Sequence, residues 1–261
     1  MVPGPFFGWY WGFSPSEIQA THALLAETLE EDDPFDAIFG FSQGATLALC
    51  YLLQHQITNP EQSPPAHFAV LFSCAGPAFS SDMQLNQDII RGLAPEDFDE
   101  LWRRLAPRST SSRSEEPCGV DVGQAQSQQQ KEAFLATLSS ALRLGNENGF
   151  IEDPETAIAQ WRAASLRGRE DAMTRIFHPA LTCARLKIPV VMVVGDNDTA
   201  EVFEQVTICR ELCDPALVEL VGHSAAHDVP KKPEEVQKIT VAIRAAEADA
   251  RLMFSAPNMS C

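Results

Sequence analysis

The sequence predicts an α/β fold in which helices cover both faces of a parallel sheet. Two features lead to this prediction. Short apolar runs with almost no charge alternate with longer stretches of helical periodicity, a pattern typical of strands that are buried on both faces. Several of these runs also end in turns rich in glycine, serine and aspartate, where a parallel strand gives way to a helix. At 261 residues the chain is long enough for one large α/β domain, and we expect a single domain over residues 1–261.

The first predicted element is a helix that begins after Ser14. Ser14 can cap the helix, Pro15 suits the first helical position, and Glu17 completes a capping box. The helix is expected to end near Glu31. His22 lies on its apolar face, and we interpret it as a packing residue rather than a catalytic one.

The sheet is expected to draw its strands from both ends of the chain. The predicted strands are 35–41, 67–73, 188–194 and 217–221. The predicted helices that follow them are 43–56, 201–213 and 233–254. The first of these helices is apolar nearly all round, which predicts that it is buried. The last is apolar on one face, which predicts that this face packs on the sheet.

The strand pattern is interrupted in the middle of the chain. Helical pieces are predicted at 95–106, 131–143 and 154–175, and no segment here is a convincing strand. The stretch 107–130 is rich in serine, glutamine and charge, which favours a flexible linker. We therefore expect a core formed by 14–75 and 186–254, interrupted by an insert at 76–185. The insert is expected to form a lid over the site, and the alternative is a disordered surface excursion.

Composition excludes several classes of function. The net charge of -17 argues against binding to nucleic acid or to an anionic membrane surface. The seven cysteines are odd in number and contain no C-x-x-C pair, so we expect reduced thiols in a cytoplasmic protein rather than disulfides or a zinc site. No apolar run reaches membrane-spanning length, and the first residues do not form a signal peptide. No metal or cofactor is expected.

One motif stands out between the first strand and the helix that follows it. Residues 40–44 read Gly-Phe-Ser-Gln-Gly, a G-x-S-x-G pattern. In a strand–turn–helix context the glycines permit a tight turn that presents Ser42 as a nucleophile. The N-terminus of the following helix favours negative charge beside it. The alternative is an ordinary serine in a glycine-rich turn.

Two further strand ends carry residues that could act with Ser42. Asp196 and Asp198 follow the strand at 188–194, and His223 and His227 follow the last strand. The carboxyl ends of parallel strands share one edge of a sheet, where open α/β sheets place their sites. A serine hydroxyl needs a histidine to take its proton, and the histidine needs a carboxylate to orient it. The chain order Ser…Asp…His is that of α/β hydrolases.

At these motifs the chain resembles the fungal serine hydrolase family, small α/β hydrolases that include polyketide-releasing thioesterases of biosynthetic clusters. The resemblance rests on Gly-Phe-Ser-Gln-Gly-Ala at 40–45, Gly-Asp-Asn-Asp at 195–198 and His-Ser-Ala-Ala-His-Asp-Val-Pro at 223–230. It implies that the acid is Asp198 and that the base is His227. Asp196 and His223 are the reserve candidates. It also implies an α/β-hydrolase-type sheet, with the backbone N–H of Gln43 as one oxyanion donor.

The residues before the first helix also resemble this family. They are aromatic and rich in glycine, with Phe6, Phe7, Trp9, Tyr10, Trp11 and Phe13. Aromatic side chains at this density are typical of a buried plug or of the wall of an apolar pocket. We expect them, together with the helical insert, to line a pocket for an acyl group.

The chain departs from the family pattern at its start. Family members begin with a strand, an oxyanion loop that contains His-Gly, and two further strands, and these are not found here, so the fold is expected to be N-terminally truncated. The predicted strand 35–41 would then form an exposed apolar edge that can pair with another chain. The second oxyanion donor would also lack its usual source. Three explanations are open: a misassigned start, a weakly active or inactive relative, or a loop at 3–12 that supplies the donor. We favour the first two.

The functional prediction is a serine hydrolase that cleaves an ester or thioester through an acyl-serine intermediate. By resemblance, the substrate is expected to be an acyl or polyketide group of fungal secondary metabolism, with a thioester on a carrier protein as one form of it. The alternative is a catalytically weak or inactive relative that acts as a binding protein.

Overall fold

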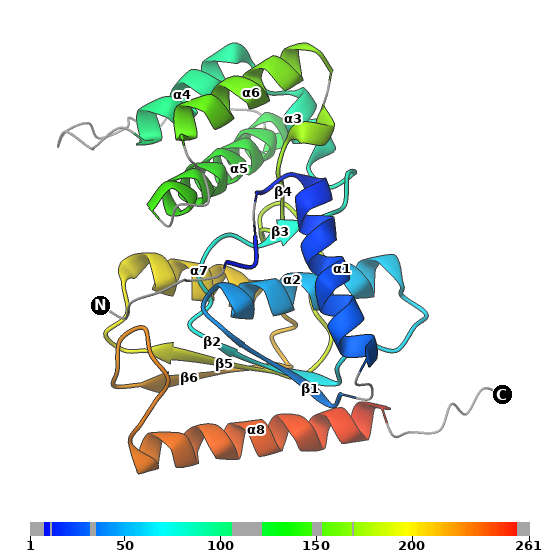
Figure 1. Cartoon of the computed structure of the whole chain (residues 1–261), viewed down its shortest axis with the longest axis vertical. Coiled ribbons are helices and arrows are strands. Elements are labelled where there is room, and N and C mark those ends of the chain that lie inside the picture. Colours follow the sequence, from blue (N-terminus) through cyan, green and yellow to red (C-terminus); the bar gives the residue numbers. More distant parts are fainter. Residues whose placement is uncertain are drawn as a thin grey trace. The chain divides into compact units, whose positions relative to one another are not determined.

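The structure is a computed structural model that describes residues 8–10, 12–31, 35–105, 122–147, 153–168 and 170–254. The chain divides into two compact units, whose elements are labelled in Figure 1. We call the first the sheet unit, which comprises Met1–Trp9, Gln19–Ala78 and Cys183–Cys261. We call the second the helical unit, which comprises Tyr10–Ile18 and Phe79–Thr182.

Parallel strands in the order β1-β2-β5-β6 form the centre of the sheet unit (Figure 1). Their bounds are Ala37–Phe41 for β1, Phe68–Phe72 for β2, Val190–Gly195 for β5 and Val218–His223 for β6. Strand β2 lies between β1 and β5, and its residue Ala69 pairs with Ile38 of β1 on one side and with Val190 of β5 on the other. The predicted α/β fold with a parallel sheet is confirmed.

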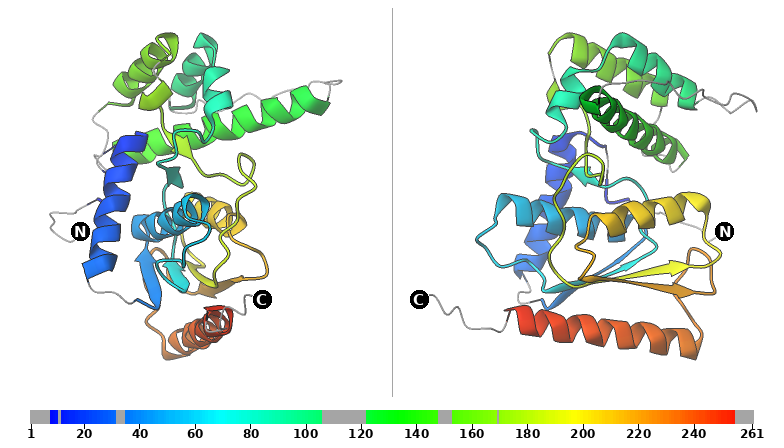
Figure 2. Two further views of the ribbon diagram at one scale, coloured as in Figure 1. Left: turned by 90° about the vertical axis from the view of Figure 1, so that its right-hand side faces the viewer. Right: turned by 180° about the vertical axis from the view of Figure 1, so that it is seen from behind.

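Helices lie on both faces of this sheet. They are α2 at Gln43–Thr58, α7 at Ala200–Glu211 and α8 at Pro233–Phe254. Helix α1 at Pro15–Glu31 belongs to the helical unit up to Ile18 and to the sheet unit from Gln19 onward. Figure 2 shows α8 along one face of the sheet and α2 and α7 on the other. The apolar face of α8 packs on the strands through Ile239, Ala242, Ala246 and Ala250, against Val70, Val191, Val193 and Val221 among others. Every residue of β5 is buried, as its uncharged sequence predicts.

The first helix begins with the predicted capping box. The backbone N–H of Ser14 donates to Glu17 Oε2 at 3.0 Å, and the backbone N–H of Glu17 donates to Ser14 Oγ at 3.4 Å. Two donors that the first turn would otherwise leave unpaired are satisfied in this way. The helix extends to Glu31, as expected, and residues 32–34 that follow it lie outside the described residues.

The helical unit contains more regular structure than the sequence suggests. Its helices are α3 at Gln87–Arg91, α4 at Pro95–Leu105, α5 at Val122–Glu147 and α6 at Pro154–Leu166, with the 3₁₀ turn η1 at Glu170–Ala172. Strands β3 at Phe79–Ser80 and β4 at Arg175–Ile176 pair antiparallel. The expectation that this region has no strand is wrong, because strands of this length carry no recognisable period.

Two helix boundaries in this unit also differ from the prediction. Helix α5 begins at Val122, inside the stretch predicted as a flexible linker at 107–130. Its glutamine and alanine residues are good helix formers, and this propensity outweighs their polarity. The part of the predicted linker at 107–121 lies outside the described residues. Helix α6 ends at Leu166, before the expected 175, and Gly168 follows in a left-handed conformation with φ of 64°.

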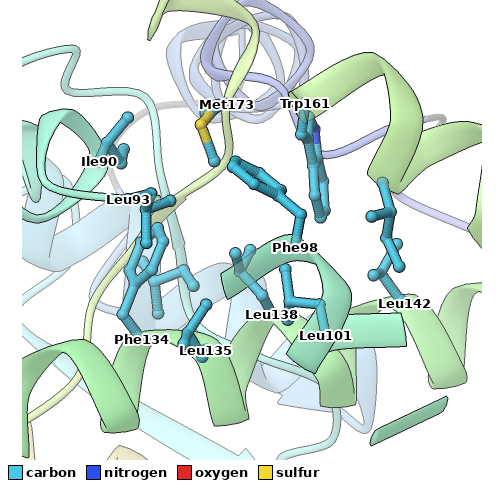
Figure 3. Packing of buried hydrophobic residues seen from close by; sticks show 12 residues of the cluster. Ile90, Leu93, Phe98, Leu101, Phe134, Leu135, Leu138, Leu142, Trp161 and Met173 are labelled. Atoms are coloured by element: carbon cyan, nitrogen blue, oxygen red, sulfur yellow. The ribbon is translucent and has the colours of Figure 1, made fainter. Parts of the chain in front are cut away.

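The helical unit has an apolar core of its own. Figure 3 shows side chains from α3, α4, α5 and α6 that meet in it, including Phe98, Leu101, Phe134, Leu138 and Trp161. Ion pairs link the same helices at their surface: Lys131 Nζ lies 2.6 Å from Asp97 Oδ2, and Arg104 Nη2 lies 2.7 Å from Glu132 Oε1. The described part of the insert is therefore a packed unit, and its expected role as a lid stays a prediction.

The described helices do not have the properties of membrane spans. None of them combines the length and the apolar character that crossing a bilayer requires.

Candidate active site

Ser42 lies in the sharp turn between β1 and α2. Its backbone has φ of 55° and ψ of -123°, a conformation that costs free energy for a residue with a side chain. Two hydrogen bonds hold the turn: Ser42 N–H donates to the carbonyl of Phe72 at 2.8 Å, and Ala75 N–H donates to the carbonyl of Ser42 at 3.3 Å. A Cβ at Gly40 would lie 2.5 Å from the Cα of Ala45. Only glycine at position 40 therefore lets α2 approach β1 so closely.

Ser42, His227 and Asp198 form one continuous hydrogen-bonded chain. His227 Nε2 lies 2.8 Å from Ser42 Oγ, and His227 Nδ1 lies 3.1 Å from Asp198 Oδ2. The Asp198 side chain is fully buried, whereas that of His227 is 35% exposed. The ring of Phe41 lies 5.1 Å from the imidazole of His227, centroid to centroid. A buried carboxylate can hold the imidazole in the tautomer whose Nε2 accepts a proton from the serine.

The turn after β5 positions the Asp198 carboxylate. Asp198 N–H donates to the carbonyl of Gly195 at 3.0 Å, which closes the turn. Its Oδ1 accepts from the backbone N–H of Thr199 at 3.0 Å, which leaves Oδ2 for the histidine. Thr199 in turn caps α7, because its side chain accepts from Val202 N–H.

The loop that carries His227 is tied to this turn by Asn197. The backbone N–H of Asn197 donates to the carbonyl of Ala225 at 3.2 Å, and its side-chain Nδ2 donates to the carbonyl of Ser224 at 2.9 Å. A Cβ at Gly195 would lie 2.2 Å from the carbonyl oxygen of Ala226, so the two loops pack backbone to backbone. Asn197 was not among the predicted site residues, although it lies inside the Gly-Asp-Asn-Asp motif.

The two reserve candidates lie elsewhere. Asp196 is exposed, and its backbone N–H donates to the carbonyl of His223 at 2.7 Å. His223 is 2% exposed, and its Nδ1 accepts from the backbone N–H of Ala225 at 3.3 Å. Among the described residues no partner is found for His223 Nε2. Neither side chain reaches the hydroxyl of Ser42 in the described part of the chain.

Gln43 directly follows the serine and contacts Trp9. Gln43 is the first residue of α2, where backbone N–H groups have no partner within the helix. Its side-chain Oε1 accepts from the backbone N–H of Trp9 at 2.9 Å. Trp9 is the one described aromatic residue of the N-terminal segment that belongs to the sheet unit.

The other aromatic residues of this segment lie apart from Trp9. Tyr10 and Phe13 are buried in the helical unit, where both rings pack on Phe79. Phe6, Phe7 and Trp11 lie outside the described residues. The expected acyl pocket therefore stays a prediction.

The described part of the chain offers no cluster of metal-ligating side chains. Within the described ranges, no group of three or more histidine, cysteine, aspartate or glutamate side chains is arranged to hold a metal ion.

Comparison with known proteins gives a consistent result. The family described as "Serine hydrolase (FSH1)" matches residues 4–239. The esterase alnB of Emericella nidulans is 31% identical over 243 residues, which cover 93% of this chain and 77% of that protein. The serine hydrolase cnsH of Penicillium expansum is 26% identical over 253 residues, which cover 97% of this chain and 94% of that protein.

Similarity to solved structures is weaker. A monoacylglycerol lipase of Paleococcus ferrophilus matches 88% of this chain and 75% of its own, with a TM-score of 0.39 and 13% sequence identity. This similarity is too low to add to the sequence comparisons.

Proposed function

The chain belongs to the serine hydrolase (FSH1) family, and we propose that it cleaves a carboxylic ester or thioester through an acyl-enzyme on Ser42. The observation that carries the proposal is the continuous hydrogen-bonded chain from Ser42 through His227 to Asp198. In this proposal Ser42 is the nucleophile, His227 is the general base and then the general acid, and Asp198 orients the histidine.

In the first half of the reaction the substrate acylates the serine. Ser42 Oγ bonds to the carbonyl carbon while its proton passes to His227 Nε2, and the carbonyl oxygen becomes an oxyanion near Gln43 N–H. The bond to the leaving group then breaks, and the proton on His227 passes to the departing alkoxide or thiolate. The buried Asp198 carboxylate stabilises the imidazolium that exists between these steps.

In the second half water releases the acyl group. His227 Nε2 takes a proton from the water as its oxygen attacks the acyl carbon, and a second oxyanion forms at the same place. Collapse of this intermediate breaks the bond to Ser42 Oγ, which recovers its proton from His227. The products are a carboxylic acid and the free enzyme.

The substrate is proposed to be an apolar acyl or polyketide group, presented as an ester or as a thioester on a carrier protein in fungal secondary metabolism. Two exposed aromatic residues support an apolar acyl group: Phe41, whose ring lies beside His227, and Trp9, which is bonded to Gln43. The similarity to the esterase alnB supports ester chemistry. A cytoplasmic location is proposed from the cysteine pattern of the sequence.

The alternative is a binding protein with little or no hydrolase activity, and one observation favours it. Strand β1 is the outer strand of the sheet in the described part of the chain. Its Phe39 is 60% exposed. An apolar edge of this kind can pair with a second copy of the chain, and partner binding could then be the main role.

A fluorophosphonate probe separates the two functions. The probe is expected to label the wild-type chain at Ser42 and to leave Ser42→Ala unlabelled, while Ser63→Ala, at an exposed serine away from the site, reacts as the wild type does. The same proteins would be assayed with matched p-nitrophenyl esters and N-acetylcysteamine thioesters of increasing chain length. A folded wild-type sample that neither reacts with the probe nor hydrolyses any of these substrates would overturn the enzymatic proposal.

Matched pairs of variants test the residue assignments. Asp198→Asn is expected to lower kcat by about 10⁴-fold, whereas Asp196→Asn leaves it nearly unchanged because Asp196 is exposed and lies outside the chain of hydrogen bonds. His227→Ala is expected to abolish turnover. His223→Asn, which keeps an acceptor for the Ala225 N–H, is expected to retain most of it. A larger loss at Asp196 or His223 would reverse the assignment.

A further inference from the structure

Trp9 is held across the turn that carries the nucleophile. Its backbone N–H donates to Gln43 Oε1 at 2.9 Å, and its backbone carbonyl accepts from Thr21 Oγ1 at 3.1 Å. The first bond ties Trp9 to the residue that follows Ser42, and the second ties it to α1. The backbone of Trp9 is therefore held between α1 and the first residue of α2.

The indole nitrogen of Trp9 lies close to Gly44, the second residue of α2. A Cβ built on Gly44 would lie 3.3 Å from Trp9 Nε1 and 3.9 Å from Trp9 Cδ1, and apart from the adjoining residues and the backbone of α2 no other atom comes within 4 Å of it. The absence of a side chain at position 44 thus leaves room for the indole. Among the described residues no hydrogen bond is found for Nε1, and the Trp9 residue is 44% exposed.

An oxyanion of acyl transfer requires more than one donor. The negative charge develops on the carbonyl oxygen, and donors already oriented toward it stabilise the transition state at no cost of reorganisation. Gln43 N–H is the first candidate donor, at the N-terminus of α2. The indole of Trp9 adds an N–H with no acceptor of its own, beside the same turn. An indole nitrogen is a donor only and does not titrate, so it suits an oxyanion at any working pH.

We propose that the indole N–H of Trp9 is the second oxyanion donor of this site. The inference rests on the proposed function and names a residue that acts in it. As Ser42 Oγ bonds to the carbonyl carbon, the π electron pair moves onto the carbonyl oxygen, which accepts hydrogen bonds from Gln43 N–H and Trp9 Nε1–H. Neither donor loses its proton. When the pair returns and the leaving group departs, both hydrogen bonds weaken again.

The competing interpretation is that Trp9 only lines the acyl pocket, and the two make different kinetic predictions. A donor to the oxyanion acts in the transition state, so its loss lowers kcat and leaves KM nearly unchanged. A wall of the pocket acts in the ground state too, so its loss raises KM. Trp9→Phe is the variant that separates them, because it keeps an aromatic ring and removes the N–H.

The experiment measures kcat and KM for a short and a long p-nitrophenyl ester. Trp9→Phe is expected to lower kcat by about 10²-fold for both esters. Ile57→Val is the control, since Ile57 is 38% exposed and lies near the other end of α2 in the sheet unit, and it should behave as the wild type. Circular dichroism and the melting temperature establish that each variant is folded.

A double-mutant cycle with Gly44 sharpens the test. Gly44→Ala places a methyl group close to the indole nitrogen, so it is expected to lower kcat roughly tenfold in the wild-type background by displacing Nε1. With Trp9→Phe already present, it should change kcat by less than about twofold, because the donor that it displaces is gone.

The outcomes distinguish this inference from the proposed function. A wild-type chain that shows neither hydrolysis nor labelling of Ser42 overturns both. An active wild type with an equal kcat in Trp9→Phe overturns the donor and leaves the hydrolase intact, as does a raised KM with unchanged kcat. If Gly44→Ala lowers kcat by the same factor in the wild type and in Trp9→Phe, the proposal that Trp9 is a donor is also overturned.

Discussion

His22 illustrates, at the scale of a single residue, how burial alters a titration. It lies on the buried face of α1 with 4% of its surface exposed, and its ring meets the edge of the Tyr51 ring at 5.8 Å. Desolvation lowers the pKa of His22 from 6.5 to about 4, because a charged imidazole is unfavourable away from water. The interpretation of His22 as a packing residue agrees with this burial.

The lowered pKa predicts a specific loss of stability in acid. Above pH 6.5 His22 is neutral in both states and contributes no pH dependence. As the pH falls from 6.5 toward 4 the unfolded chain binds a proton that the folded chain does not, so the free energy of unfolding falls by about 2 kcal/mol between pH 7.5 and 5 from this residue. Urea unfolding at the two pH values measures the change.

The control is another histidine of the sheet unit. His22→Gln is expected to remove this part of the pH dependence, whereas His67→Gln, at a side chain that is 41% exposed, keeps it. Because other groups titrate as well, the difference between the variants is the readout. Equal pH dependence in the wild type and His22→Gln would contradict the prediction.

At the scale of the elements, the site depends on two loops that follow neighbouring strands. Strands β5 and β6 pair up to Gly195 and His223, and the loops beyond them bring Asp198 to His227. Asn197 joins the loops through its backbone and its side chain, as described above. The distance between the carboxylate and the imidazole is therefore set by the loops together and not by either alone.

Removing the side chain of Asn197 is expected to loosen this arrangement. Asn197→Ala keeps the backbone bond to Ala225 and loses the side-chain bond to the Ser224 carbonyl, so kcat should fall roughly tenfold while the protein stays folded. Asn59→Ala is the control, since Asn59 donates to its neighbour Thr58 at the end of α2. Steady-state kinetics and melting temperatures are measured for both, and an unchanged kcat in Asn197→Ala would show that the backbone bonds suffice.

At the scale of the whole molecule, strand β1 bears on whether two copies of the chain associate. It pairs with β2 on one side, and in the described part of the chain no strand pairs with its other side. The exposed Phe39 and Phe41 lie on one face of this outer strand. An unpaired apolar edge favours association with a second copy through strand pairing.

A charge on this edge is expected to suppress self-association. Phe39→Lys places a cation in the outer strand, which opposes pairing of two such edges. Leu252→Lys is the control, because Leu252 is 78% exposed on α8 and equally apolar. Sedimentation velocity over a range of concentrations should show dimers in the wild type and in Leu252→Lys, and mainly monomers in Phe39→Lys. A wild-type chain that is monomeric at every concentration would exclude this mode of assembly.

Much of the molecule could be predicted from its sequence because the signals concerned are local. The helix at 15–31 was predicted from Ser14 and Glu17, which satisfy each other's backbone within one turn. The strands of the sheet were predicted from uncharged runs, because a strand buried on both faces excludes charge. The start of α5 was missed, since a polar, glutamine-rich stretch resembles a linker until its helix packs against neighbours.

The sequence by itself determined the order of strands and helices along the chain, because apolar periodicity marks each element. It also determined that three loops lie at one edge of the sheet, because parallel strands share their chain direction. Spacing alone could not separate Asp196 from Asp198 or His223 from His227, since each pair follows the same strand and differs only in how the loop turns, and the preference for Asp198 and His227 came from the resemblance to the family. The tertiary structure brought Asp198 and His227 to Ser42, and it also set the division into two units and the contact of Trp9 with the turn. These features depend on contacts between residues far apart in the chain, and such contacts leave no periodic signal in the sequence.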